Sequence, residues 1–226
     1  MIDNVIRIHK ELHGKGATVE AIIADLDITN SQTIEEYIIS RLNVKSSEQF
    51  GVFIGRCQPF HLGHQAVVNE IMLDGKKPII VLGSINKQDE KNPLTYRERY
   101  DLIKLVYPKD VIITGCKDNV NWDLWFEGLI NSILQSADTI RDNITIFYHN
   151  KPDDRLDFVY KDIEYKNEFY TKVFEIEGIK MKQIDFVNRD DFKIQSNGRD
   201  IRHNIEGFKH FLDARVYWSL KEKCWK

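Results

Sequence analysis

At residues 55–64 the sequence reads Gly55-Arg56-Cys57-Gln58-Pro59-Phe60-His61-Leu62-Gly63-His64, directly after the apolar run Phe50–Ile54. A short apolar run that ends at glycine predicts a buried strand, and the residues after His64 predict a helix. The ten residues between them therefore form a strand-to-helix turn. Glycine lets the main chain approach a ligand closely, and the first turn of a helix presents unpaired N–H groups to an anion. This turn is a predicted phosphate-binding site, with His61 and His64 at its helical end.

Strands and helices alternate from residue 50 onward. Apolar runs predict strands at 50–55, 78–83, 110–114 and 143–148, and the stretches between them predict helices at about 62–74, 95–106 and 121–136. A fifth strand is expected at 182–187 and a helix over 199–220, whereas residues 151–180 follow no regular pattern. This alternation is typical of a parallel sheet with helices on both faces, so the predicted fold class is α/β, a doubly wound, Rossmann-like sheet. Such sheets bind ligands at the carboxyl ends of their strands.

Residues 1–49 have a different character. Apolar residues recur at helical spacing from Ile2 to Leu12, and Thr33-Ile34-Glu35-Glu36 fits the pattern of a capping box that starts another helix. We interpret residues 1–49 as a small helical module for packing or partner binding. The polar segment 45–49 is the expected linker to a domain that spans residues 50–226.

The composition excludes several classes of protein. The formal net charge is −3, so the chain as a whole does not attract nucleic acid, and local positive groups must hold any anionic ligand. No segment approaches the ~18 consecutive apolar residues of a membrane span, and no signal-peptide pattern is present. A cytoplasmic protein with no membrane partner is therefore expected. Cys57, Cys116 and Cys224 lie far apart, which indicates neither a disulfide framework nor a zinc site.

The Gly55–His64 stretch resembles the signature of the adenylyl- and cytidylyltransferase superfamily, a His-x-Gly-His pair after the first strand. Within that superfamily it is most similar to the nicotinamide mononucleotide (NMN) adenylyltransferases of the archaeal and bacterial NadM type, whose signature reads Gly-Arg-Phe-Gln-Pro-Phe-His-x-Gly-His. Only Cys57 differs from it. Arg56 and Gln58 favour this type, because relatives that use other acceptors usually have Gly-Thr-Phe-Asp at these positions.

Two further segments resemble the same family. Asn92–Arg99 is similar to its Asn-Pro-Phe-Thr-x-x-Glu-Arg, and by this resemblance Arg99 contacts a substrate phosphate. The segment 118–125 resembles the one in which a tryptophan stacks on the nicotinamide ring. Spacing from Asn121 assigns that role to Trp125, with Trp122 as the rival one helical turn away. The loop Tyr148–Pro152 matches only loosely and receives no roles.

Ile194–Arg202 occupies the place of the family signature Ile-Ser-Gly-Thr-x-Ile-Arg. Two alignments stay open. Asn197 takes the position of the serine if Gly198 and Arg202 are aligned, whereas Ser196 is the signature serine if one residue is inserted. In both alignments a polar turn opens a helix that carries Arg202, and a guanidinium group suits the oxygens of a pyrophosphate.

The resemblance implies an enzyme that joins NMN and ATP to give NAD and pyrophosphate, by direct attack of the NMN phosphate on the α-phosphate of ATP. It assigns catalysis to His61, His64 and Arg202. The expected ATP-binding residues are Gly55, Arg56, Cys57, Gly63, Asn197 and Gly198, and the expected NMN-binding residues are Gln58, Arg99, Asn121 and Trp125. Mg²⁺ is expected on the ATP phosphates, with no protein ligands assigned to it.

Two other functions remain open at this point. One keeps the fold and changes the acceptor to nicotinate mononucleotide, phosphopantetheine or another phosphorylated molecule. The other is a non-catalytic nucleotide sensor with residues 1–49 as its effector module. A Nudix hydrolase, which some relatives carry, is not predicted because its Gly-x₅-Glu-x₇-Arg-Glu box does not occur in this sequence. Assembly into a homo-oligomer is left open.

Overall fold

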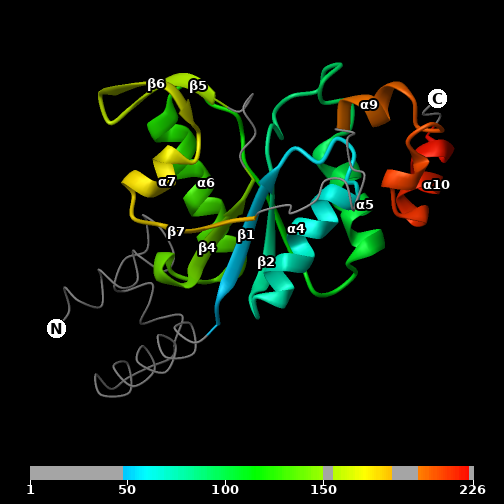
Figure 1. Ribbon diagram of the computed structural model, residues 1–226, viewed down its shortest axis with the longest axis horizontal. Helices are drawn as coiled ribbons and strands as arrows, with labels where there is room; N and C mark the ends of the chain where they lie inside the picture. Colours follow the sequence, from blue (N-terminus) through cyan, green and yellow to red (C-terminus); the bar gives the residue numbers. More distant parts are fainter. Residues whose placement is uncertain (1–47, 150–154, 185–197, 224–226) are drawn as a thin grey trace, which may run out of the picture.

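The computed structural model describes residues 48–149, 155–184 and 198–223 (Figure 1). The predicted helical module of residues 1–49 lies outside the described residues, apart from Glu48 and Gln49. The domain that was predicted from residue 50 begins with a strand at that residue.

The centre of the molecule is a five-stranded sheet in which every neighbouring pair is parallel, in the order β3-β2-β1-β4-β7. Its strands are β1 (Phe50–Gly55), β2 (Lys77–Leu82), β3 (Ile112–Gly115), β4 (Ile144–Tyr148) and β7 (Lys180–Gln183). The chain moves outward from β1 through β2 to β3, and then crosses to the other side of β1 for β4 and β7. The strand order therefore reverses between β1 and β4, and their carboxyl ends border the crevice where such sheets bind ligands. The predicted α/β fold class is confirmed.

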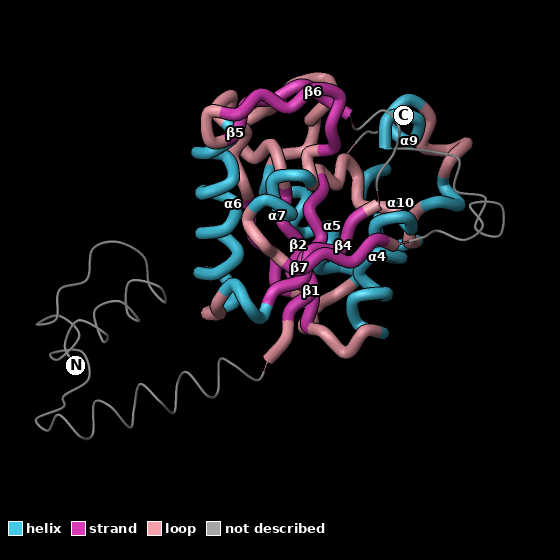
Figure 2. Tube along the Cα trace, turned by 60° about the vertical axis from the view of Figure 1, so that its left-hand side comes forward, coloured by secondary structure: helices cyan, strands magenta, loops and turns pink. Residues whose placement is uncertain are grey.

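Helices cover both faces of this sheet (Figures 1 and 2). One face carries α4 (Leu62–Leu73) and α5 (Tyr96–Val106), and the other carries α6 (Trp122–Ala137) and α7 (Lys172–Ile176). Alternate residues of β2 point to opposite faces, so Ile79 and Val81 pack toward α6 while Ile80 and Leu82 pack toward α4 and α5. Within the described ranges, none of the helices is both long enough and apolar enough to cross a bilayer.

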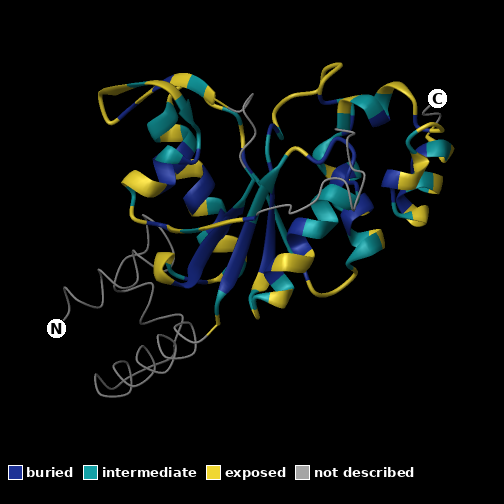
Figure 3. Ribbon diagram, in the orientation of Figure 1, coloured by how far each residue is buried: buried dark blue, intermediate teal, exposed yellow. Residues whose placement is uncertain are grey.

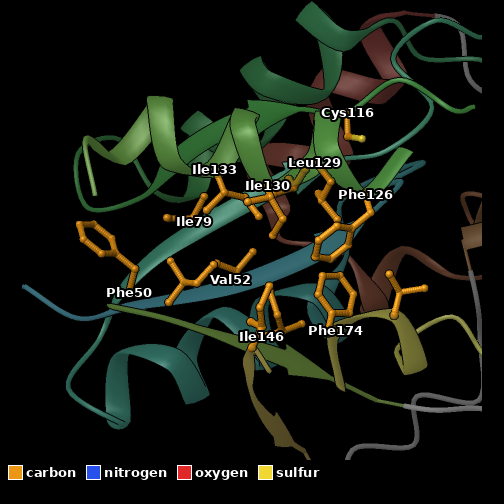
Figure 4. Close-up of a cluster of buried hydrophobic side chains, with 14 of the residues drawn as sticks. Phe50, Val52, Ile79, Cys116, Phe126, Leu129, Ile130, Ile133, Ile146 and Phe174 are labelled. Carbon is orange, nitrogen blue, oxygen red and sulfur yellow. The ribbon is translucent and has the colours of Figure 1, made fainter. Parts of the chain in front are cut away.

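The main core lies between the sheet and α6, and the central strands are the most deeply buried part of the molecule (Figure 3). One stripe of α6 meets the strands and α7, as the close-up in Figure 4 shows. The buried residues of this core include Phe126, Leu129, Ile130 and Ile133 of α6, together with Val52, Ile79, Ile146 and Phe174. Full burial of each such side chain stabilises the fold by roughly 1.5–3 kcal/mol relative to exposure.

A satellite core joins the end of the described chain to α5. It contains the short helix α9 (Gly198–His203), the 3₁₀ turn η3 (Lys209–Phe211) and helix α10 (Ala214–Glu222). The helical prediction for 199–220 is confirmed at both ends of this range, but the helix is interrupted. A turn around Asn204 ends α9, and Asp213 starts α10 as its N-cap, accepting the Arg215 N–H at 2.9 Å. The buried members of this satellite core are Leu94, Leu102, Ile201, Ile205, Phe211, Leu212, Val216 and Leu220.

A separate antiparallel hairpin lies beside α6, at the top of the molecule in Figure 1. It consists of β5 (Arg155–Tyr160) and β6 (Ile163–Phe169), joined by Lys161 and Asp162 with φ of 50° and 60°. Two consecutive positive φ values are typical of a type I′ turn, which matches the twist of a two-stranded ribbon. This hairpin was not predicted from the sequence, which follows no regular pattern over residues 151–180.

Candidate functional site

His61 and His64 begin helix α4. His61 is the N-cap, and its Nδ1 accepts the N–H of Gly63 at 3.1 Å. In return, the N–H of His61 donates to Nδ1 of His64 at 3.3 Å. These reciprocal bonds make a capping box from two imidazole rings, where serine or threonine and glutamate are usual. The two rings are stacked, with their centroids 3.7 Å apart.

The capping bonds also decide where each ring holds its proton. A neutral imidazole that accepts a hydrogen bond at Nδ1 carries its proton on Nε2, so both rings are assigned the same tautomer. The His64 ring lies between Phe53 and Phe60, at centroid distances of 5.5 and 5.7 Å, which restricts its rotation. Each Nε2–H is therefore a positioned donor at a helix start, where the helix dipole also favours negative charge.

Two arginines hold the loop that leads from β1 to α4. Nη1 of Arg99 donates to the carbonyl oxygen of Arg56 at 2.9 Å, and Nη1 of Arg202 donates to the carbonyl oxygen of Gln58 at 2.6 Å. Arg202 lies on α9, so its contact joins segments that are 144 residues apart in the sequence. Cys57 lies between the two carbonyls with a φ of 50°, a strained conformation for a residue other than glycine.

The Cys57 side chain faces away from solvent and is 1% exposed. Burial raises the pKa of this thiol to about 12, against an opposing effect of the nearby Arg99 charge. The thiol is therefore protonated at neutral pH. Any contact between Cys57 and a phosphate therefore has to come from its main chain.

The start of α9 packs directly on the same loop. A Cβ atom at Gly198 would lie 2.7 Å from the carbonyl oxygen of Gln58, so only glycine permits this approach. Burial lowers the pKa of Arg202, and the neighbouring charges of Arg56 and Arg199 lower it further. The three guanidinium groups concentrate positive charge beside the loop of a chain with a net charge of −3, which suits a polyphosphate. Asn197 lies outside the described residues.

The two glycines that were assigned to ATP lie at the ends of the motif. Gly55 is the last residue of β1, and its carbonyl accepts the N–H of Gly83 at 3.1 Å, which keeps the loop in register with β2. Gly63 is in the first turn of α4 and gives its N–H to the His61 ring. Their predicted contacts with ATP stay predictions.

A cleft of ≈ 340 Å³ opens beyond the carboxyl end of β3 and is lined in part by Lys117, Asn119 and Trp125. Trp125 projects from α6, whereas the ring of Trp122 packs against Phe158 of the hairpin at a centroid distance of 4.7 Å. The structure thus places Trp125 at the cleft and Trp122 against the hairpin. Stacking of Trp125 on a ligand stays a prediction.

Asp118 connects the loops on two sides of this cleft. Its carboxylate accepts the Ser84 hydroxyl at 3.0 Å and pairs with Lys87 at 2.7 Å, and its main chain exchanges hydrogen bonds with the Asn86 side chain. Lys117 and Asn119, which line the cleft, were not among the predicted site residues, although both flank Asp118 and Asn119 lies in the segment that resembles the family.

Three of the residues assigned to NMN make internal hydrogen bonds, and two of them, Gln58 and Arg99, are buried, whereas Asn121 is exposed. Asn121 caps α6 by accepting the Leu124 N–H at 3.0 Å. Gln58 and Arg99 are 4% and 0% exposed and bond to main-chain groups. The contacts of Asn121, Gln58 and Arg99 favour structural support of the site over direct contact with a substrate.

A resident metal would need a cluster of suitable ligands. In the described part of the chain, no group of three or more His, Cys, Asp or Glu side chains could hold a metal ion.

Comparisons with known proteins agree with the fold and the motif. A family model described as cytidylyltransferase-like matches residues 52–190. The chain is 27% identical over 174 residues to the nicotinamide-nucleotide adenylyltransferase of Methanolobus tindarius, covering 75% of this chain and 86% of the relative. It is 25% identical over 191 residues to the nicotinamide/nicotinic acid mononucleotide adenylyltransferase of Acinetobacter baylyi, covering 76% of this chain and 91% of the relative.

The fold is also similar to that of a solved structure, the bifunctional NMN adenylyltransferase/ADP ribose pyrophosphatase from Francisella tularensis. The TM-score is 0.56 with 22% sequence identity, over 77% of this chain. The match spans 49% of that larger protein, so this chain corresponds to about half its length.

Proposed function

The chain belongs to the cytidylyltransferase-like family, and we propose that it transfers the adenylyl group of ATP to NMN, giving NAD and pyrophosphate. The observation that carries this proposal is the loop at the end of β1. Two stacked histidines close one end of it, Arg202 binds its Gln58 carbonyl, and the cleft with Trp125 opens at the same edge of the sheet.

The chemistry needs no covalent intermediate. An oxygen of the NMN phosphate attacks the α-phosphorus of ATP in line, a new P–O bond forms, and the bond from that phosphorus to the bridging oxygen breaks to release pyrophosphate. A phosphate monoester is already nucleophilic at neutral pH, so catalysis consists of positioning two anions and stabilising the charge that develops. Mg²⁺ enters as part of the ATP substrate, bound to its phosphate oxygens.

The assigned residues fit these two tasks. The Nε2–H groups of His61 and His64, with the Arg202 guanidinium, donate to the oxygens of the transferring and leaving phosphates. Main-chain groups of Gly55, Arg56 and Cys57 line the phosphates, and Gly63 leaves room for adenine. Asn197 and Gly198 belong to the turn that opens the helix carrying Arg202, on the ATP side of the site. Trp125 stacks on the pyridine ring of the acceptor. ATP is an intracellular metabolite, and we place the reaction in the cytoplasm.

Nicotinate mononucleotide is the second candidate acceptor. Lys117 lines the cleft beside Trp125, and a cation there suits a carboxylate on the pyridine ring. The Acinetobacter baylyi relative is named for both acceptors.

The test is formation of NAD by the purified chain from NMN and MgATP, followed with a coupled dehydrogenase and by pyrophosphate release. Nicotinate mononucleotide and phosphopantetheine are supplied as competing acceptors. His64→Ala is expected to lower kcat by about 10²-fold while leaving the fold intact, because a positioned transition-state donor is lost. Unchanged turnover of His64→Ala would remove this histidine from the mechanism. Tight ATP binding by the wild type without turnover of any acceptor would favour a nucleotide sensor.

A further inference from the structure

Arg99 is a buried cation that ties the ends of two strands together. It lies on α5 with 0% exposure, and its Nη1 donates to the carbonyl oxygens of Arg56 at 2.9 Å and Gly83 at 2.7 Å. Arg56 directly follows β1, and Gly83 directly follows β2. One nitrogen therefore fixes the two adjacent strands at the edge of the sheet where the phosphate loop begins. The Nε of the same side chain donates to the Thr95 carbonyl at 3.3 Å, which holds the guanidinium to the start of α5.

Arg99 forms no ion pair with a carboxylate among the described residues, although the charge of Asp118 acts on it from a distance. The buried Nη2 of Arg99 has no hydrogen-bond partner among these residues. Burial lowers the pKa of this guanidinium, but arginine stays protonated in proteins. Carbonyl oxygens carry only partial negative charge, so the positive potential extends to the strand ends. This positive potential is strong because the buried surroundings of Arg99 have a low effective dielectric constant. The potential therefore favours an anion at this edge of the sheet.

Gln58 holds the other half of the same loop. Its side-chain amide donates to the Leu94 carbonyl at 2.8 Å and accepts the Leu94 N–H at 3.0 Å. Both polar atoms of the Gln58 side chain thus bond to the main chain of Leu94, just before α5. Loop and helix are joined at two points, by Gln58 at the segment before the helix and by Arg99 one turn inside it.

We propose that Arg99 is a positioning residue for the nucleotide half of the site, supported by Gln58. It holds the Arg56 end of the Gly55–His64 loop in the conformation that binds the ATP phosphates, and it does so without touching either substrate. This inference rests on the proposed adenylyl transfer.

The test compares Arg99→Met, Arg99→Lys and Arg97→Met. Arg97 is on the same helix two residues earlier, with a side chain that is 78% exposed and paired with Asp101, so it is the matched control. Arg99→Met is expected to lower kcat/KM for ATP by about 100-fold, because a preorganised charge is lost and the loop is misplaced. Arg99→Lys keeps the charge and is expected to recover about tenfold of that loss, while KM for NMN changes by less than about twofold.

Two results would overturn the proposal. A rise in KM for NMN alone, with the ATP parameters unchanged, would make Arg99 a ligand of the acceptor phosphate. A lower Tm in both Arg99 variants, with wild-type ATP parameters in the folded fraction, would reduce Arg99 to a purely structural residue.

Direct ATP binding by calorimetry, on wild type and variants alike, separates this proposal from the proposed reaction. If wild type makes no NAD, the reaction fails as a proposal. The positioning role of Arg99 is then still tested by the ATP affinity of its variants, which should be lower than that of Arg97→Met. Equal affinities would refute the positioning role.

Discussion

At Gly198 the start of α9 lies directly against the Gly55–His64 loop. Its missing side chain lets α9 approach the Gln58 carbonyl, the same oxygen that Arg202 binds at 2.6 Å. Gly198→Ala would put a Cβ 2.7 Å from that oxygen, so α9 and Arg202 must move. A displacement of about 1 Å at a reacting centre can cost up to about 10²-fold in rate, and we expect kcat/KM for ATP to fall 10- to 100-fold.

Steady-state kinetics and thermal unfolding together check this prediction. Because α9 is anchored in the satellite core by Ile201 and Ile205, Tm should change little. Kinetics equal to wild type would mean that the Arg202 contact with the loop is unimportant for turnover.

At the residue scale, the sequence predicts which positions gather at the site better than it predicts what each side chain does. The spacing of His61 and His64 places both at a helix start, where their capping bonds orient them. For Gln58 and Arg99 the sequence pattern does not indicate in which direction the side chain points. Whether their polar atoms face a ligand or a main-chain carbonyl depends on how α5 packs against the β1 loop, and that packing involves residues about 40 positions apart.

The two tryptophans of helix α6 contact each other, with ring centroids 5.1 Å apart, and both pack against the main core. Trp125 lines the cleft, and Trp122 packs on Phe158 of the hairpin. We expect Trp125→Leu to raise KM for NMN by about tenfold, since stacking of a base on an aromatic ring is worth roughly 1–3 kcal/mol. Tm should fall as well, because the same ring packs against Tyr170 and Phe174.

Trp122→Leu is the matched control on the same helix. It should likewise lower the free energy of unfolding by roughly 1–3 kcal/mol but leave KM for NMN near wild type, so KM is the readout that separates the two variants. Steady-state kinetics and urea unfolding of both variants decide the assignment, and an exchange of the two outcomes would move the ligand platform to Trp122.

At the element scale, the apolar runs predict the inner strands well because central parallel strands are buried on both faces. Strand β1 has the predicted bounds of 50–55. The outer strand β7 begins at Lys180 and not at residue 182, since its exposed Lys180 and Lys182 carry no apolar signal. The β5–β6 hairpin does alternate, with Phe158 and Tyr160 inward, but its charged outward residues and its Lys161-Asp162 turn without glycine hid it.

For the whole molecule, the nucleotide site depends on contacts between distant parts of the chain. Arg202 reaches the Gly55–His64 loop only because α9 and α10 pack on α5 through the satellite core. The sequence identifies Arg202 by its resemblance to the family signature, but it does not reveal this packing. Three of the side chains that create it, Ile205, Phe211 and Leu212, lie in the irregular segment between α9 and α10, where periodicity gives no signal.

One carboxylate connects α5 to the end of α10, and it makes stability depend on pH. Glu98 accepts a hydrogen bond from Lys223 at 2.8 Å and from the Thr95 N–H at 2.9 Å. These contacts, the one to Lys223 foremost, lower the pKa of Glu98. A carboxylate whose folded-state pKa lies below its unfolded value stabilises the fold above the unfolded pKa, and this contribution is lost as the pH falls through the folded value.

We therefore expect the free energy of unfolding to decrease as the pH falls below the ordinary glutamate pKa of about 4.3. Glu98→Gln removes the titrating group, so this variant is less stable than wild type at pH 7 but loses less stability on acidification. Urea unfolding at a series of pH values measures both effects, with Glu70→Gln, at an exposed position of α4, as the control that should follow wild type. Parallel stability curves for Glu98→Gln and wild type would mean that the contact between Glu98 and Lys223 contributes nothing to holding α10 against α5.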